Sequence, residues 1–528
     1  MRITILVNSI KSMERSKNKQ LAINMMASFV SFVVGFGISF FLTPYIVKSI
    51  GREAYGFIGL ANNVIGYTSL VTIALNSMAG RFITIEYVEG NKESANKYYS
   101  SVFYCNVVLS LFIALVMAVV IWKLELLFNI PAKLLWDVKI LFLLLTINSI
   151  IGLLTGIYGI ATFIKNRLEL SSIRSIIGNL IRAVFLIVAF GLLFPKITYF
   201  GIAALLTTLY CALTNLHYTR ELTPELRVKK RDFCWNDVKK LVMSGAWNVV
   251  SKLSDMLEQG LDLVIANVCI GASAMGFYSL TKNVPFLILG IFQMIAGVFA
   301  PLFTTLYAQH NKPELVHELS KSIRILGFFT NIPLVFLYVF GDYFYKLWLP
   351  GEDSSKLQLL TILGSAGLVF AMPLESLWNI FTITNKLKYS SLTMLLEGIL
   401  TFLTVMTSLL FVKEEWMRLM ILAGASTFWG TLRALFFLPI YGSYCLKLDK
   451  KMFYPPVFKS FLSFAILMVI CLSVKHLFVI KLTWLTLAFY GIIVVSSCCI
   501  VGFIVTLTKK DRDFLGNIAM RYIKKYTN

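Results

Sequence analysis

Long apolar segments recur along nearly the whole chain, and only short polar connections separate them. Each segment is about 20 residues or longer, which allows a helix to cross a hydrocarbon layer of about 30 Å. The pattern predicts an all-α, polytopic membrane protein with about 14 transmembrane helices. The predicted spans are residues 21–47, 54–79, 99–122, 138–162, 173–194, 198–219, 241–268, 275–301, 325–348, 357–383, 389–411, 419–445, 458–480 and 482–507.

Composition agrees with this pattern. Of the 528 residues, 58% are hydrophobic and only 14% are charged, whereas soluble domains carry roughly 25% charge. The net charge of +22 could suggest a nucleic-acid partner. If the N-terminus is cytoplasmic, however, most of the 49 Lys and Arg lie on the cytoplasmic side, as the positive-inside rule requires. The sequence therefore predicts a multi-pass protein with both termini in the cytoplasm and no nucleic-acid partner.

No motif for enzyme chemistry stands out in the sequence. A phosphate-binding GxxxxGK[ST] loop is absent, the eight Cys form no CxxC pair, and the four His lack partners at metal-ligand spacing. The longest predicted loops, of about 20 residues, leave little room for a membrane-embedded polymerase or glycosyltransferase. We therefore expect a protein that is not an enzyme and has no cofactor, no catalytic residues and no metal site.

An internal repeat organises the predicted spans. The segment IGREAYGFIGLANNV, Ile50–Val64, aligns without a gap to IGASAMGFYSLTKNV, Ile270–Val284, and the match includes glycine and asparagine as well as apolar residues. Each copy would hold six spans, and an even number makes both copies enter the membrane from the same side. Parallel repeats of this kind are a transporter design. The polar segments 81–98 and 304–321 align in the same register and are expected to form short interfacial helices.

The repeat gives a prediction for the domains. They are a cytoplasmic N-terminus (1–20), a first six-helix bundle (21–222), a basic cytoplasmic linker (223–240), a second six-helix bundle (241–446), two extra transmembrane helices (447–507) and a basic cytoplasmic tail (508–528).

The segment Asn24–Val64 resembles the start of Wzx-type oligosaccharide flippases, which are polysaccharide biosynthesis membrane proteins of the MOP exporter superfamily. The resemblance rests on the Gly/Ser/Phe-rich first span, the connection TPYIVKSIGREAYG at Thr43–Gly56, and the polar LANNV that enters span two. It implies two bundles arranged in a V that open alternately to each face of the bacterial inner (plasma) membrane. It also implies a substrate, undecaprenyl-pyrophosphate-linked oligosaccharide of the O-antigen or capsule type, and possible partners in a polysaccharide polymerase and glycosyltransferases. A cation-coupled multidrug exporter is the alternative function.

Transport of such a lipid makes a demand on the spans, because a diphosphate and sugars cannot cross hydrocarbon without polar partners. Arginine suits a diphosphate best, since its planar fork binds two oxygens at once. Charged residues inside spans are costly and indicate function by default. The first bundle is cationic inside, and Arg182 either contacts the anion or bonds backbone carbonyls or a distant acid. The candidate substrate-binding residues are Arg182, Arg174, Arg81, Arg433, Lys282, Asn62 and Asn63.

The second bundle carries mixed charge. One polar stripe is expected along the helix that includes SKLSDMLEQGLD, Ser251–Asp262. Three interpretations are open: interhelical salt bridges to Arg433 or Lys282 that latch the two halves together, a Na⁺ or H⁺ site that couples transport to an ion gradient, and direct contact with substrate. The residues concerned are Lys252, Asp255, Glu258, Asp262, Glu375 and Glu397.

Overall fold

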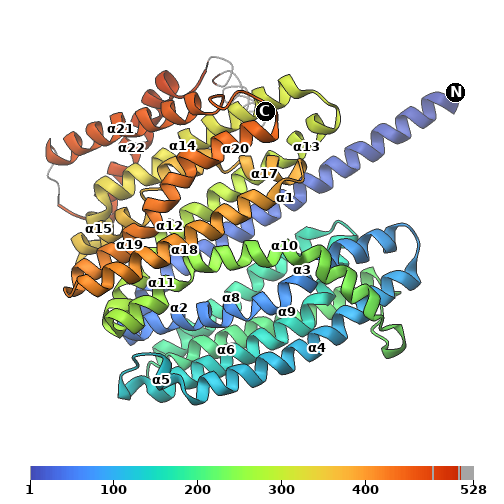
Figure 1. Cartoon of the computed structure of the whole chain (residues 1–528), viewed down its shortest axis with the longest axis horizontal. Helices are drawn as coiled ribbons and strands as arrows, with labels where there is room; N and C mark the ends of the chain where they lie inside the picture. The colour runs from blue at the N-terminus through green and yellow to red at the C-terminus, as the bar shows by residue number, and fades with distance from the viewer. Residues whose placement is uncertain (1, 478–480, 509–511, 513–528) are drawn as a thin grey trace. The chain divides into compact units, whose positions relative to one another are not determined.

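The chain is helical throughout the part that the structure describes, which in this computed structural model comprises residues 2–477, 481–508 and 512 (Figure 1). It forms two compact units. Unit 1 comprises Met1–Leu253 and Gly271–Gly276, and unit 2 comprises Ser254–Ile270 and Phe277–Asn528. Two helices, α10 and α12, begin in unit 1 and continue into unit 2.

Unit 1 is built on six long helical segments. The most extensive neighbours are α6 with α9 and α1 with α8. The helices are α1 (Arg2–Ile50), α2 (Arg52–Tyr67), α3 (Ser69–Val88), α4 (Lys92–Trp122), α5 (Leu124–Leu127), α6 (Leu135–Gly156), α7 (Ile160–Ile164), α8 (Leu168–Leu192), α9 (Thr198–Leu222) and the start of α10 (Trp235–Gln259), with 3₁₀ turns at Ala132–Leu134, Ile157–Gly159 and Lys230–Asp232.

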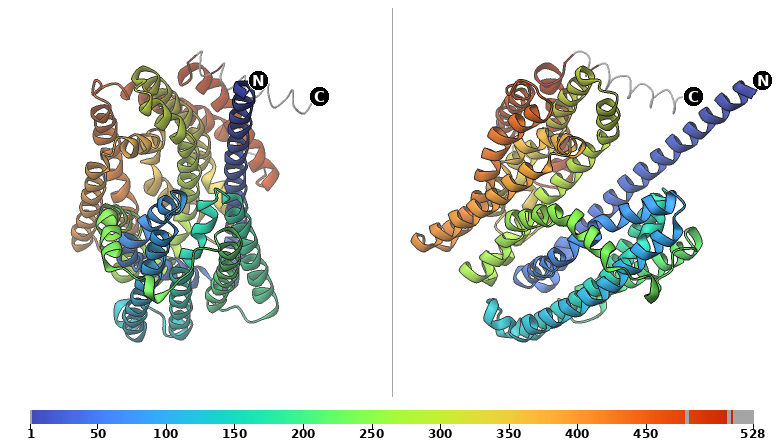
Figure 2. Two further views of the ribbon diagram at one scale, coloured as in Figure 1. Left: turned by 90° about the vertical axis from the view of Figure 1, so that its right-hand side faces the viewer. Right: turned by 45° about the vertical axis from the view of Figure 1, so that its right-hand side comes forward.

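Unit 2 is built around α14, against which α21 and α22 both pack (Figure 2). Its helices are α11 (Leu261–Ile265), α12 (Ala272–Val298), α13 (Ala300–Ala308), α14 (Lys312–Trp348), α15 (Ser354–Ser365), α16 (Leu368–Ala371), α17 (Leu377–Ile383), α18 (Leu387–Phe411), α19 (Glu415–Leu432), α20 (Leu438–Cys445), α21 (Tyr454–Leu477) and α22 (Trp484–Val505), with π-helical turns at Ala266–Ile270 and Arg433–Phe437 and a 3₁₀ turn at Met372–Leu374.

Within the described residues, 11 helices are long and apolar enough to span a membrane, or up to 13 if each of two bent pairs counts as one span. The predicted span 241–268 is not among them. It forms α10, α11 and a π-helical turn, broken near Gly260, and its charged stripe makes it too polar to be recognised by hydropathy. The predicted span 54–79 is one of the bent pairs, in which α2 and α3 meet at an angle of 61°.

The expected interfacial helices at 81–98 and 304–321 are not separate elements, and that prediction was wrong. Residues 81–88 are the end of α3, and α4 begins at Lys92 after a tight turn. The second copy repeats this arrangement, with α13 ending at Ala308 and α14 beginning at Lys312. Gly90 and His310 occupy equivalent turn positions and both have positive φ, 88° and 55°. The two polar segments therefore extend the neighbouring helices, and a tight turn is the only interruption in each.

The repeated glycines have a structural role in unit 1. Gly51 and Gly271 both adopt positive φ, 83° and 144°, in the breaks that precede α2 and α12. Gly56 and Gly276 lie against each other, and a Cβ on Gly56 would come within 2.7 Å of the Cα of Gly276. Small residues permit such a close approach of two helices. The recurrence of this glycine pair in the sequence therefore reflects a single contact to which each copy contributes one residue.

The connection after α9 is fastened along α4. The amide of Arg227 donates to Asn96 Oδ1 at 2.8 Å, that of Lys229 to Ser100 Oγ at 3.0 Å, and that of Cys234 to Ser101 Oγ at 2.8 Å. Lys92 Nζ contacts Glu225 Oε1 at 2.6 Å. Backbone amides in this connection thus donate to side chains on α4, in place of the backbone carbonyls that would accept from them in a helix or sheet.

The attachment of this connection is expected to weaken at acidic pH. Hydrogen bonding to Lys92, then to its own backbone amide and to Tyr87, lowers the pKa of Glu225 from 4.5 to about 2. Because the pKa of Glu225 is lower in the folded protein than in the unfolded chain, the ionised carboxylate stabilises the fold at pH values above about 4.5. This stabilisation is lost as the pH falls from about 4.5 to about 2. Glu225→Gln should therefore speed amide hydrogen exchange at Arg227 at neutral pH. Unchanged exchange would show that the hydrogen bonds to α4 suffice.

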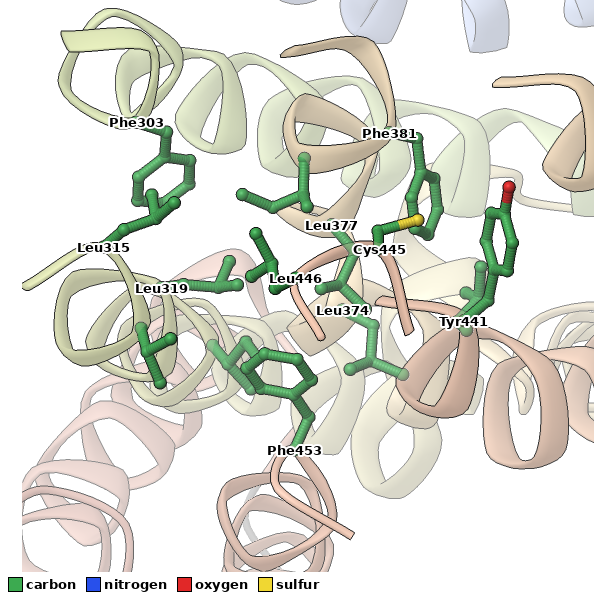
Figure 3. Packing of buried hydrophobic residues seen from close by; sticks show 14 of the residues in the cluster. Phe303, Leu315, Leu319, Leu374, Leu377, Phe381, Tyr441, Cys445, Leu446 and Phe453 are labelled. Carbon is green, nitrogen blue, oxygen red and sulfur yellow. The ribbon is translucent and has the colours of Figure 1, made fainter. Parts of the chain in front are cut away.

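Unit 2 has an apolar core between α13, α14, α17, α20 and the start of α21. In Figure 3, Phe303 and Leu319 approach Leu377 and Leu446 from one side, while Phe381 and Tyr441 lie on the other. Phe303, Leu319, Leu377 and Phe381 are fully buried. This packing holds α17, whose Trp378 contacts Arg433, and α20, which directly follows the turn that begins at Arg433.

Candidate functional site

Arg182 is a half-buried cation near the middle of α8 in unit 1. Its guanidinium carbon lies 4.7 Å from the ring centroid of Phe200 on α9. Its buried Nε has no hydrogen-bond partner, and no acidic side chain forms an ion pair with Arg182 among the described residues. A cation–π contact compensates a desolvated guanidinium only in part. Arg182 therefore retains unused hydrogen-bond donors, which an anion can accept.

The other predicted residues of unit 1 have different surroundings. Arg174 lies about two turns before Arg182 and donates to Asn215 Oδ1, and to Ser171 Oγ at 2.8 Å, so its partners are neutral. Arg81 is exposed on α3. Asn62 on α2 donates its amide to the Ile58 carbonyl at 2.9 Å, and Asn63 follows it on the same helix. The structure does not bring these residues into one cluster with Arg182.

Asp262 and Lys282 form an ion pair inside unit 2. Lys282 Nζ lies 2.6 Å from Asp262 Oδ2, and the Tyr278 hydroxyl donates to the same oxygen at 3.2 Å. Asp262 comes from α11 and its two partners from α12. The helix break at Gly260 and the π-helical turn at Ala266–Ile270 turn the chain so that these helices meet.

Glu397 and Arg433 form a second ion pair inside unit 2. Arg433 Nε lies 2.8 Å from Glu397 Oε2, and Glu397 is only 4% exposed. Arg433 opens a π-helical turn, and its guanidinium lies 5.9 Å from the Trp378 ring centroid. Gly430 makes room for the carboxylate, since a Cβ there would lie 2.8 Å from Glu397 Oε1. The ion pair thus lies where the helix changes to a π-helical turn and where Gly430 leaves space for the carboxylate.

The remaining charged residues predicted in the second bundle lie on α10 and beside a 3₁₀ turn. Lys252 and Asp255 are half-buried on α10, and Glu375 is half-buried next to the 3₁₀ turn Met372–Leu374. The side chain of Glu258 lies outside the described residues. Both ion pairs above join residues of the second half, so neither is itself a latch between the two halves.

One cluster with metal-ligand atoms was not anticipated from the sequence. The side chains of Glu314, His317 and Glu318 on α14 lie within 4.8 Å of one another. The ammonium of Lys321 already lies 3.2 Å from both Glu318 oxygens. Because a bound metal would have to compete with that ammonium, we assign no metal site here.

A polar cavity of about 370 Å³ lies inside unit 1, where α2 and α3 meet at their break. Side chains of α4 and α6 complete it. The lining residues are Asn62, Ile65, Gly66, Thr68, Ser69, Thr72, Ile113, Leu145, Asn148, Ser149 and Leu153. Only Asn62 among them was predicted as a site residue. The run Gly66-Tyr67-Thr68-Ser69 in the middle of an apolar span was the signal that could have indicated it.

The sequence matches a known protein family and a membrane protein of Bacillus subtilis. The family model described as polysaccharide biosynthesis protein matches residues 49–350, more than half of the chain. The membrane protein EpsK of Bacillus subtilis is 28% identical over 497 residues, which cover 94% of this chain and 97% of EpsK.

Solved structures support the predicted fold. The lipid II flippase MurJ in an inward closed conformation aligns with a TM-score of 0.68 at 17% identity, covering 94% of this chain and all of MurJ. An inward-facing multidrug resistance MATE transporter of the MOP superfamily aligns with a TM-score of 0.67 at 15% identity, covering 81% and 97%. The expected all-helical membrane fold, with the architecture that MurJ and the MATE transporters share, is thereby confirmed.

Proposed function

We propose that this chain, which belongs to the polysaccharide biosynthesis protein family, is a flippase for oligosaccharide repeat units linked to undecaprenyl diphosphate. Its direction would be from the cytoplasmic to the outer leaflet of the bacterial cell membrane, by alternating access of the bundles 21–222 and 241–446. The fold is shared by a lipid flippase and a drug exporter, so the fold alone does not choose a substrate.

The observation that carries the proposal is the uncompensated charge of Arg182. A charged side chain within a transmembrane helix costs roughly 2.5–3.5 kcal/mol on insertion scales, and a structural role would normally supply a partner acid. The guanidinium of Arg182 lies over the ring of Phe200 and has no ion-pair partner in the described chain. A diphosphate supplies the missing partner, because a guanidinium binds phosphate oxygens through two parallel hydrogen bonds.

Arg174 supports the same interpretation. Its neutral partners, Asn215 and Ser171, orient the guanidinium without cancelling its charge. Two net positive groups on one face of α8 favour an anion and disfavour the cationic compounds that the alternative function, drug export, would require. Arg81, Asn62, Asn63, Lys282 and Arg433 remain proposed contacts with the substrate.

The acids of the second bundle retain two proposed roles. Asp262 and Glu397 each contact a basic side chain at 2.6 and 2.8 Å, which favours the ion-pair interpretation for these two. For Lys252, Asp255, Glu258 and Glu375, coupling to Na⁺ or H⁺ remains the proposal. An outward-moving anion is already favoured by the membrane potential, by roughly 2.3 kcal/mol per charge per 100 mV. Coupling would then serve to return the empty carrier.

The test is translocation by the purified protein in lipid vesicles. A lipid-linked oligosaccharide with a fluorophore on its glycan is placed in both leaflets, and dithionite destroys the fluorescence of the outer leaflet. We expect nearly all fluorescence to be lost with the protein present and about half to be protected in protein-free vesicles. Vesicles loaded with a cationic dye provide the comparison. Export of the dye under an ion gradient, without movement of the lipid, would favour the drug exporter instead.

A further inference from the structure

The cavity at the break between α2 and α3 is uncharged. Its polar lining is made of amides and hydroxyls, from Asn62, Thr68, Ser69, Thr72, Asn148 and Ser149, and none of its lining residues is Asp, Glu, Lys, Arg or His. It therefore has nothing to neutralise a phosphate or an organic cation. Its size, about 370 Å³, falls at the lower end of pockets that hold small molecules.

Two polar atoms of this lining have no partner within the described chain. Asn148 Oδ1 and Ser69 Oγ are both buried without a hydrogen bond. Asn106, another buried residue of the same bundle, has a partner: its side-chain amide and that of Asn76 form two reciprocal hydrogen bonds of 2.9 Å. An unpaired buried polar atom is destabilising. The bundle thus pairs the amide of Asn106 and leaves Oδ1 of Asn148, a residue of the cavity lining, without a partner.

The other polar groups keep acceptor capacity. The hydroxyls of Thr68 and Thr72 donate to the carbonyls of Ile65 and Ser69, at 2.6 and 3.1 Å, which leaves their oxygen lone pairs available. Asn62 likewise uses its amide nitrogen on its own helix and keeps its carbonyl oxygen. The lining therefore offers several acceptors, which suit a ligand rich in hydroxyl donors.

The helix break supplies a reason for the position of the cavity. A break within a transmembrane segment leaves backbone groups without helical partners, and these are tolerated where they line a cavity. The apolar part of the lining is formed by Ile65, Ile113, Leu145 and Leu153. A sugar ring combines hydroxyls at its edge with apolar C–H faces, so it matches a lining of mixed polarity. A lipid tail would leave Asn148 and Ser69 unsatisfied.

We propose that this cavity binds a neutral sugar ring of the glycan that the lipid carries. The proposal rests on the proposed function, because it divides substrate recognition between two places in unit 1. Arg182 would bind the diphosphate, and the cavity would bind a sugar. Asn62 is exposed and also lines the cavity, so the cavity is open to entry.

The test measures binding of two fluorescent probes to the full-length protein in nanodiscs: a polyprenyl diphosphate without sugar, and the same lipid carrying a disaccharide. We expect the native protein to bind the glycosylated probe more tightly. Asn148→Leu should weaken that binding roughly threefold to tenfold and leave the sugar-free probe unaffected. Ser69→Ala should act in the same direction, and it removes only a hydroxyl without a partner, so folding is preserved.

Thr155→Val is the matched control, because this hydroxyl on α6 bonds its own helix at Ile151 and does not line the cavity. It should bind both probes as the native protein does. If the native protein binds the two probes equally, or if both cavity variants keep the preference for sugar, the cavity holds only water and this proposal is overturned while the flippase proposal stands. If the native protein binds neither probe, the flippase proposal is overturned and this one with it.

Discussion

Replacing Arg182 by alanine is expected to lower the rate of lipid-linked oligosaccharide translocation roughly tenfold to a hundredfold. Hydrogen bonds to a charged group contribute about 1.5–3 kcal/mol, and Arg182 has donors that no described protein group uses. The rate is measured in vesicles at matched protein content. Arg182→Lys should recover part of the rate, since an ammonium keeps the charge but not the bidentate geometry.

Stability provides the control for this first prediction. Because Arg182 has no partner acid, its replacement should leave the apparent melting temperature in detergent unchanged or raise it, as is common where function opposes stability. Arg418 is the matched contrast. Its guanidinium donates to the carbonyls of Val412, Cys269 and Leu409, at 2.7, 3.0 and 3.4 Å, so Arg418→Ala should lower the melting temperature. Native rates from Arg182→Ala would exclude the proposed anion site.

Glu397→Ala is expected to destabilise the folded protein by about 3–5 kcal/mol, because it leaves Arg433 buried without its partner acid. The free energy of unfolding is measured by titration with SDS from detergent micelles. The double replacement Glu397→Leu with Arg433→Met should be much closer to native, since both charges leave together and apolar groups fill the space. Glu93→Ala, which removes an exposed i,i+4 pair with Lys97, should change little.

The same double variant separates the proposed roles of Glu397. If the pair only holds α18 to the π-helical turn after α19, and Arg433 does not contact the substrate, the folded double variant should translocate lipid at close to the native rate and keep its response to ion gradients. If Glu397 instead carries a cation, the double variant should fold yet lose that response. Additive losses from the two single replacements would contradict the pairing itself, because groups in direct contact are not energetically independent.

The sequence by itself determined the class of protein and much of its layout. Hydrophobic runs specify membrane helices, since a segment in hydrocarbon must satisfy its backbone internally. The repeat at Gly51–Gly56 and Gly271–Gly276 was visible because a positive φ and a close helix crossing both restrict the residue to glycine. Arg182 was also a candidate from the sequence, since its charge in an apolar run needs no contact information to be noticed.

Tertiary structure alone decided which charges remain unpaired. Asp262 meets Lys282, and Glu397 meets Arg433, across distances in sequence that no helical spacing relates. It also decided that the apolar run at 54–79 bends at Thr68 and that the polar run 81–98 continues two long helices. The reason is physical: hydropathy records the cost of placing a residue in lipid, whereas the bend, the cavity beside Asn148 and the ion pairs depend on what neighbouring helices present to that residue.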